Sequence, residues 1–193
     1  MALVVVTGGA RSGKSATAAR LAGRRADAGA EVVVVAFGES GGDPEMEARI
    51  ERHRQERDVR FAVCEAACGC SWMAEVSEGS LVLIDCLGTL VARLMSECDD
   101  DPALDPLAVE AALDARVTEV IAWLVRRAGD TIVVTNEVGS GVVPAYPSGR
   151  LFRDVLGRAN AQLTSVADAS YLAVAGRLVD LGALPRDVPW PGE

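Results

Sequence analysis

Five short hydrophobic runs divide the chain: Leu3–Val6, Glu31–Ala36, Leu81–Ile84, Thr131–Thr135 and Tyr171–Val174. The apolar residues in each run follow one another directly and do not alternate with polar ones. This pattern is typical of parallel strands that are covered on both faces. The runs therefore predict five strands of a parallel sheet.

The segments between these runs show helical spacing of apolar residues. Helices are predicted from Ser15 to Ala22, ending at Gly23, and over Pro44–Arg57, Leu107–Ala128 and Arg150–Val166. Strands that alternate with helices predict an α/β fold with a mostly parallel central sheet and helices on both faces. Ligands of such folds bind at the carboxyl ends of the strands.

Proline and acidic residues mark the segments outside this pattern. Asp99–Pro106 is predicted to be a loop, and Pro185–Glu193 a loose tail. A chain of 193 residues suits one domain, here residues 1–184 followed by the tail.

A glycine-rich turn follows the first predicted strand and opens the first predicted helix. Its residues match the pattern G-x-x-x-x-G-K-[ST] and are Gly8, Gly9, Ala10, Arg11, Ser12, Gly13, Lys14 and Ser15. In this setting the pattern predicts a P-loop, whose backbone N–H groups surround a phosphate chain. Lys14 is expected to contact the β- and γ-phosphates, and the Ser15 hydroxyl to bind Mg²⁺.

The composition supports a special role for Lys14. Of the 19 basic residues, 18 are arginine and Lys14 is the only lysine. A compact ammonium group fits close to a phosphate where a guanidinium does not. Because the chain has no lysine besides Lys14, it cannot contain the motif Asn-Lys-x-Asp with which Ras-type GTPases bind guanine. The net charge of −9 argues against a nucleic-acid-binding face, and no apolar run is long enough to span a membrane, so we expect a cytoplasmic protein.

A P-loop enzyme also needs a carboxylate that faces the metal from the end of a neighbouring strand. Asp85 directly follows Leu81–Ile84 and is predicted to supply it, on a strand beside the P-loop strand. Glu137 follows the fourth predicted strand and is an alternative. The sequence leaves the choice between these two acids open.

His53 is the only histidine of the chain. It lies in the predicted helix Pro44–Arg57, with Arg49 and Arg57 four residues to either side. Arginines near an imidazole disfavour its charged form and bind phosphate. A neutral ring nitrogen next to a bound phosphate is what a nucleophile for phosphorus requires.

Four motifs, in this order, resemble one enzyme family. They are GGARSGKS at Gly8–Ser15; Glu45-Met46-x-Ala48-Arg49-Ile50-x-x-His53-Arg54; Thr135-Asn136-Glu137-Val138-Gly139 with Gly141-Val142-Val143-Pro144; and Phe152-Arg153-Asp154-x-x-Gly157-Arg158-x-Asn160. The chain resembles the bifunctional adenosylcobinamide kinases / adenosylcobinamide-phosphate guanylyltransferases of cobalamin biosynthesis along nearly its whole length.

This resemblance implies a P-loop NTPase fold and two reactions. ATP or GTP would phosphorylate the aminopropanol hydroxyl of adenosylcobinamide. GTP would then guanylylate a histidine, matched by His53, and GMP would pass to the cobinamide phosphate to give adenosylcobinamide-GDP. Mg²⁺ would be the cofactor, and the assembly a homotrimer.

The same resemblance implies nucleotide contacts outside the P-loop. They fall on Ala36, Phe37, Gly38, Arg54, Gln55, Glu56, Arg57, Glu65 and Asp85. The cobinamide site is expected near the carboxyl ends of the strands, including the loop around Gly139–Pro147.

The sequence alone leaves two other functional hypotheses open. One is a P-loop kinase of another small metabolite, which would use Lys14, Ser15 and Asp85 and leave His53 idle. The other is a nucleotide-gated binding or assembly module similar to RecA-like proteins. A GMP adduct on the protein after incubation with GTP and Mg²⁺ would separate both from the two-step enzyme.

Overall fold

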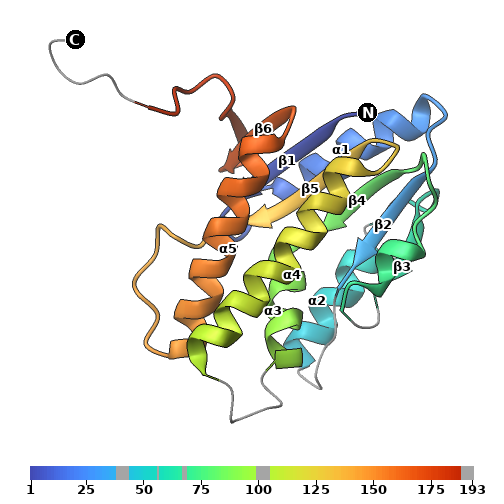
Figure 1. Cartoon of the computed structure of the whole chain (residues 1–193). Helices are drawn as coiled ribbons and strands as arrows, with labels where there is room; N and C mark the ends of the chain where they lie inside the picture. Colours follow the sequence, from blue (N-terminus) through green and yellow to red (C-terminus); the bar gives the residue numbers. More distant parts are fainter. Residues whose placement is uncertain (38–43, 56, 67–68, 99–104, 188–193) are drawn as a thin grey trace, which may run out of the picture.

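A sheet of seven strands forms the centre of the computed structural model, which describes residues 1–37, 44–55, 57–66, 69–98 and 105–187 (Figure 1). Across the sheet the order is β3-β2-β4-β5-β1-β6-β7. Six neighbouring strands are parallel, and only β7 runs antiparallel, against β6. The bounds are β1 Leu3–Gly8, β2 Val32–Ala36, β3 Ala62–Glu65, β4 Leu81–Asp85, β5 Thr131–Asn136, β6 Ala169–Val174 and β7 Arg177–Asp180. The prediction of a mostly parallel sheet is confirmed.

Helices cover both faces of this sheet, as predicted (Figure 1). Helix α1 (Lys14–Asp27) packs Ala18 and Ala22 on one face, against side chains of β2, β4 and β5. Helices α3 (Leu87–Cys98), α4 (Pro106–Arg126) and α5 (Pro147–Val166) pack on the other face. The alternate residues of each central strand thus enter two separate cores, which explains their continuous apolar sequence.

Two more helical segments occur among the described residues, α2 (Pro44–Gln55) and the short 3₁₀ helix η1 (Ser71–Ala74). Within α2 the side chains of Met46, Arg49 and His53 lie outside the described part of the chain. Among the described helices, none is long and apolar enough to cross a membrane.

Several boundaries differ from the sequence prediction. Helix α1 continues past Gly23 to Asp27, since an isolated glycine costs a helix only about 1 kcal/mol and the packed face runs on. Pro106 belongs to α4 and not to the preceding loop, because the Asp105 carboxylate caps the helix by accepting a hydrogen bond from the Leu107 N–H at 3.3 Å. Residues 99–104 of the expected loop and 188–193 of the expected tail lie outside the described residues.

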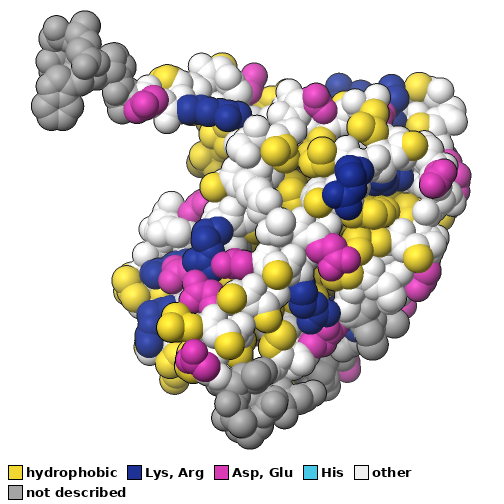
Figure 2. Space-filling view, viewed as in Figure 1, with side chains coloured by type: hydrophobic (Ala, Val, Ile, Leu, Met, Phe, Trp, Pro, Cys, Tyr) yellow, Lys and Arg dark blue, Asp and Glu magenta, His cyan; other side chains and the backbone are white. Residues whose placement is uncertain are grey.

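Acidic and basic side chains pair where α4 and α5 meet the surface, as Figure 2 shows for this face. Arg158 of α5 contacts Glu110 at 2.8 Å and Asp114 at 2.9 Å on α4. Such exposed pairs contribute about 0–1 kcal/mol each, so they add little to the stability of the contact between the two helices.

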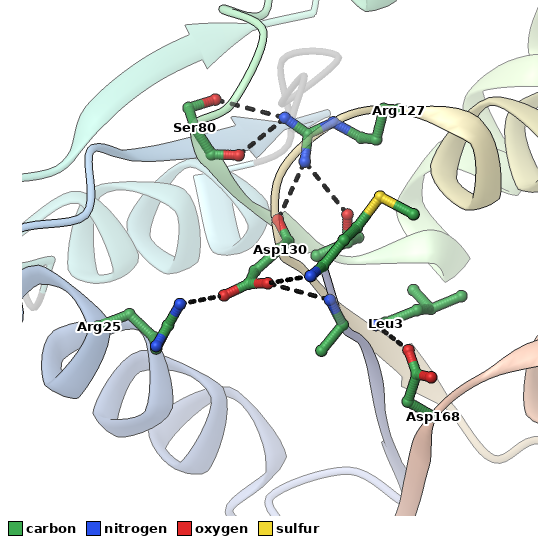
Figure 3. A network of polar contacts seen from close by, with 9 residues as sticks. Leu3, Arg25, Ser80, Arg127, Asp130 and Asp168 are labelled. Carbon is green, nitrogen blue, oxygen red and sulfur yellow. Dashed lines mark hydrogen bonds and ion pairs between the residues drawn. The ribbon is translucent and has the colours of Figure 1, made fainter.

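A polar network connects the amino-terminal ends of the central strands (Figure 3). The Asp130 carboxylate accepts a hydrogen bond from the Ala2 N–H at 2.9 Å and pairs with Arg25 of α1 at 2.5 Å. The buried Arg127 guanidinium donates to the Ser80 carbonyl at 2.8 Å and to the Asp130 carbonyl at 3.0 Å. These bonds join the starts of β1, β4 and β5. The candidate site lies at the other end of these strands, at their carboxyl ends.

Candidate functional site

The P-loop residues Gly8–Ser15 connect β1 to α1, as predicted. A Cβ on Gly8 would lie 2.5 Å from the Ala173 carbonyl oxygen, so only glycine fits beside β6. Gly13 has a φ of +94°, a conformation that favours glycine. The Gly176 N–H, in the turn between β6 and β7, donates to the Ser12 carbonyl at 3.0 Å. The turn between β6 and β7 therefore supports the P-loop from outside.

Lys14 and Ser15 open α1 at the centre of the site. Lys14 is buried, with 8% of its surface exposed, and its Nζ donates to the Gly9 carbonyl at 3.1 Å. The ammonium group thus lies inside the loop that would hold phosphate. The Ser15 hydroxyl donates to Oδ1 of Asp85 at 3.3 Å.

Asp85 reaches Ser15 although its strand is not beside the P-loop strand. The expectation of adjacent strands is wrong, because β5 lies between β1 and β4. Helix α1 crosses over β5 and β4, and its first turn therefore meets the end of β4. The predicted meeting of Ser15 and Asp85 results from the helix and not from neighbouring strands.

Glu137, the alternative acid, has a different position. Its Oε1 accepts hydrogen bonds from the Gly139 N–H at 2.6 Å and from the Ser140 N–H at 3.0 Å. The side chain is exposed and closes the turn after β5. The structure thus brings Asp85, and not Glu137, to the P-loop serine.

A cavity of about 370 Å³ runs along the carboxyl edge of the sheet. Residues from β2, β3, β4, β5 and four helices line it: Lys14, Ser15, Ala36, Ile50, Arg54, Arg57, Glu65, Asp85, Cys86, Thr89, Asn136, Val138 and Phe152. Its size is in the usual range of small-molecule sites.

Two cationic groups lie at one end of this cavity, Arg54 in α2 and Arg57 just after the helix, which ends at Gln55 and not at Arg57 as predicted. Arg54 pairs with Glu65 at the end of β3 at 2.6 Å. Burial lowers the pKa of Arg57, and the Asp85 carboxylate partly counters that effect by favouring the charged form. The guanidinium remains charged at neutral pH, so the cavity offers Arg54 and Arg57 to an anionic ligand.

Seven of the predicted site residues thus meet in one cavity, and others do not. Phe37 is 2% exposed and packs edge-on against Trp72, with ring centroids 5.4 Å apart. It belongs to the core, because alternate residues along β2 and its continuation point to opposite faces, and of the two described residues Ala36 and Phe37 only Ala36 lines the cavity. Gln55 donates to Glu51 at 2.8 Å along the exposed side of α2. Gly38, Glu56 and the His53 side chain lie outside the described residues.

Six lining residues were not assigned to the site from the sequence: Ile50, Cys86, Thr89, Asn136, Val138 and Phe152. Four of them, Ile50, Asn136, Val138 and Phe152, lie within the motifs that carry the family resemblance. Their place in these motifs was the signal that could have assigned them to the site. Cys86 and Thr89 carry no signal of their own. They enter the site because α3 begins directly after β4.

Comparisons with known proteins agree with this geometry. The family model described as "Cobinamide kinase / cobinamide phosphate guanyltransferase" matches residues 4–181. The chain belongs to the cobinamide kinase / cobinamide phosphate guanyltransferase family.

Named members of this family align with nearly the whole chain. The "Bifunctional adenosylcobalamin biosynthesis protein CobU" of Escherichia coli (strain K12) is 37% identical in an alignment of 184 residues that covers 90% of this chain and 96% of the relative. The protein of that name from Salmonella typhimurium is 37% identical over 179 residues, again 90% and 96%. "Bifunctional adenosylcobalamin biosynthesis protein CobP" of Pseudomonas aeruginosa is 33% identical over 183 residues, covering 94% and 98%.

The fold of this family member is also found among solved P-loop ATPases. An ATPase of a bacterial type III secretion system matches with a TM-score of 0.53 and 10% identity, over 93% of this chain and 56% of that one. At this identity the match concerns the fold alone. It confirms the α/β P-loop architecture.

Proposed function

We propose that this chain phosphorylates adenosylcobinamide with ATP or GTP and then transfers GMP from GTP, through His53, to the adenosylcobinamide phosphate. The observation that carries the proposal is the meeting of buried Lys14, the Ser15–Asp85 pair and two arginines, Arg54 and Arg57, in one cavity. The family membership supports the choice of substrates.

The kinase step is assigned to the P-loop. The backbone N–H groups of Gly9–Ser15 and the amino end of α1 would hold the triphosphate, and Lys14 would leave the Gly9 carbonyl for the β- and γ-phosphates. This step is positioning together with neutralisation of charge.

The side chains at the amino end of α1 suit a magnesium ion. Ser15 and Asp85 present a hydroxyl and a carboxylate within 3.3 Å of each other, and such hard oxygen ligands are what Mg²⁺ binds beside the oxygens of a phosphate chain. When bound, Mg²⁺ would neutralise charge on the phosphates. Ser15 and Asp85 are the proposed residues that hold it.

The guanylyl step is assigned to α2. A nitrogen of His53 would attack the α-phosphorus of GTP, forming the N–P bond as the bond to pyrophosphate breaks. An oxygen of the cobinamide phosphate would then attack the same phosphorus and release the histidine. Ile50 and Arg54 line the cavity, so the backbone turn that includes residue 53 borders it. Arg54 and Arg57 would neutralise the phosphates of GTP.

The remaining parts of the proposal follow the family resemblance. Ala36, Gly38, Glu56 and Glu65 would contact nucleotide, with Phe37 and Gln55 contributing through the backbone. Residues 1–184 would act as one domain, in a cytoplasmic homotrimer that binds no nucleic acid. Light scattering on the purified protein measures the assembly.

Mass spectrometry after incubation with GTP and Mg²⁺ tests the central claim. Wild type is expected to gain the mass of one GMP, and His53→Ala to gain none while it still transfers the γ-phosphate to cobinamide. Arg52→Ala, an exposed position next to His53, is the matched control and should label normally. A labelled His53→Ala protein would remove His53 from the mechanism. An unlabelled wild type that phosphorylates cobinamide would leave a kinase only.

A further inference from the structure

The cavity has one wall for which the proposed nucleotide contacts provide no role. Across the sheet, the ends of β3 and β2 carry Glu65 and Ala36, and the Arg54 and Arg57 side chains lie at that end. The other wall is formed by Cys86 and Thr89 at the start of α3, Asn136 and Val138 after β5, and Phe152 of α5. We call these five residues the β5 wall.

The β5 wall lies beside the P-loop at the carboxyl ends of the strands. Asn136 is the register partner of Gly8 across β5 and β1, and Cys86 packs against the core on the α1 face. Two further wall residues come from the opposite face of the sheet. Helix α1, which begins with Lys14 and Ser15, packs on one face. Helices α3 and α5, which carry Thr89 and Phe152, pack on the other. A phosphate chain held at the amino end of α1 therefore has Asn136 next to it and Thr89 and Phe152 across the ends of the strands from it.

Asn136 is held in this wall by two neighbouring elements. The Asn160 side-chain N–H of α5 donates to the Asn136 carbonyl at 2.9 Å, and the Thr135 hydroxyl donates to Oδ1 of Asn160 at 2.6 Å. The Cys86 thiol donates to Oδ1 of Asn136 at 3.3 Å and lies 2.9 Å from the Thr89 hydroxyl. A Cβ on Gly88 would lie 2.9 Å from the same Oδ1, so α3 packs directly against the amide.

The chemistry of the β5 wall suits an alcohol on an apolar carrier. Val138 and Phe152 offer apolar surface, while Thr89 offers a hydroxyl. Within the part of the chain that the structure describes, the Asn136 Nδ2 has no hydrogen-bond partner. It is thus available to an oxygen atom in the cavity. Among the five residues of the β5 wall, the Cys86 thiol is the only ionisable group. The neighbouring Asp85 carboxylate lies at the border of the wall.

The rim beyond Val138 extends this apolar surface. Val142, Val143 and Tyr146 are 95%, 62% and 77% exposed in the loop that follows β5. Arg150 of α5 holds that loop by donating to the Pro144 and Ala145 carbonyls, each at 3.0 Å. A substrate too large for a cavity of about 370 Å³ can insert its alcohol end and rest its body on this rim.

We propose that the β5 wall binds the hydroxyl-bearing end of the corrinoid acceptor, with Asn136 and Thr89 orienting the hydroxyl; this rests on the proposed function. The acceptor oxygen forms a bond to the γ-phosphorus while the bond from that phosphorus to the β–γ bridging oxygen breaks. The nucleoside diphosphate leaves with the electron pair, and the hydroxyl proton passes to water. Asn160 acts as a positioning residue for Asn136.

Steady-state kinetics of γ-phosphate transfer on the full chain test this assignment. Phe152→Ala is expected to raise the KM for cobinamide about tenfold, Phe152→Leu to restore most of it, and Thr89→Val to raise it severalfold. The KM for ATP and the formation of the GMP adduct from GTP alone should stay within twofold of wild type. Thr118→Val, an exposed threonine of α4, is the matched control and should change nothing.

The possible results separate a failure of the β5 wall assignment from a failure of the proposed function. A KM for ATP that rises together with that for cobinamide, or alone, would place the β5 wall in the nucleotide site and overturn the assignment. So would an unchanged KM for cobinamide in all three variants. Wild type that shows no cobinamide-dependent phosphate transfer would contradict the proposed function itself. Thermal unfolding of each variant identifies any that fails to fold, and Thr89→Val, which keeps the side-chain volume, then decides.

Discussion

The Ser15 hydroxyl lies 3.3 Å from the Asp85 carboxylate although β5 separates the strands that lead to them. Helix α1 produces this contact by packing Ala18 and Ala22 over β4 and β5. The pair joins the phosphate-binding end of α1 to the middle of the cavity. Its two oxygens are the described groups best suited to a magnesium ion beside the P-loop.

Asp85→Asn is expected to raise the Mg²⁺ concentration needed for half-maximal rate at least tenfold in both steps. The amide keeps the shape of the side chain and removes the charge that attracts the ion. Rates measured across a Mg²⁺ titration test this. Glu137→Gln is the matched control, since Glu137 closes a turn outside the lining, and it should keep the wild-type requirement. A large metal defect in Glu137→Gln with a normal Asp85→Asn would exchange the two roles.

Lys14→Ala is expected to lower the rates of both steps about 10³-fold or more, because both need the triphosphate in the same loop. Lys14→Arg should fail nearly as badly. The lysine side chain is only 8% exposed within the loop, so the larger guanidinium fork does not fit there. Paired assays of phosphate transfer and GMP adduct formation measure both rates. Near-native rates in Lys14→Arg would show that the single lysine of the chain is replaceable.

Asp130→Asn is expected to destabilise the protein by about 1–3 kcal/mol at neutral pH. Burial acts to raise the pKa of Asp130, but the Ala2 N–H and Arg25 outweigh it and hold the pKa below its ordinary value of 3.8. Because this folded-state pKa is lowered, the carboxylate stabilises the fold fully above about pH 4–5 and loses that effect as pH falls through the folded value. Denaturant unfolding from pH 7 to pH 3 should show the two proteins converging toward low pH. A difference that does not depend on pH would contradict this.

The parts of the fold that were predicted from sequence depend on local patterns. Leu81–Ile84 and Thr131–Thr135 are continuously apolar because both faces of their strands are covered, and each is a strand in the structure. The P-loop was predicted in full, because its glycines and Lys14 act within eight consecutive residues. Such local signals do not reveal strand order, which is why β4 was expected beside β1.

Elements that depend on distant packing were not predicted. All residues of β7 are exposed, so its sequence has neither the apolar run nor the alternation that indicates a strand. Phe37 follows β2 in the expected place, yet Trp72, 35 residues away along the chain, holds it in the core. Cys86 and Thr89 reach the cavity only through the packing of α3 against Asn136. None of these contacts has a signature in neighbouring residues.

The turn between β6 and β7 should affect nucleotide binding although it lies outside the cavity lining. Gly176 donates its N–H to the Ser12 carbonyl at 3.0 Å and has a φ of +75°, which costs other residues about 1–2 kcal/mol. A Cβ there meets nothing within 4 Å, so Gly176→Ala changes the backbone preference without a clash. If the turn shifts, the P-loop loses an external support, and the KM for ATP is expected to rise up to about tenfold.

Gly29→Ala is the matched control for this effect. Gly29 has a φ of +89°, also has open space around it, and lies after the far end of α1 from the P-loop. Both substitutions should lower the thermal midpoint, whereas only Gly176→Ala should raise the KM for ATP. Gly176→Asn should recover most of the affinity, because asparagine tolerates positive φ better than alanine. Equal losses of stability with an unchanged KM in Gly176→Ala would show that the P-loop keeps its shape without the turn, and that the hydrogen bond to Ser12 serves folding alone.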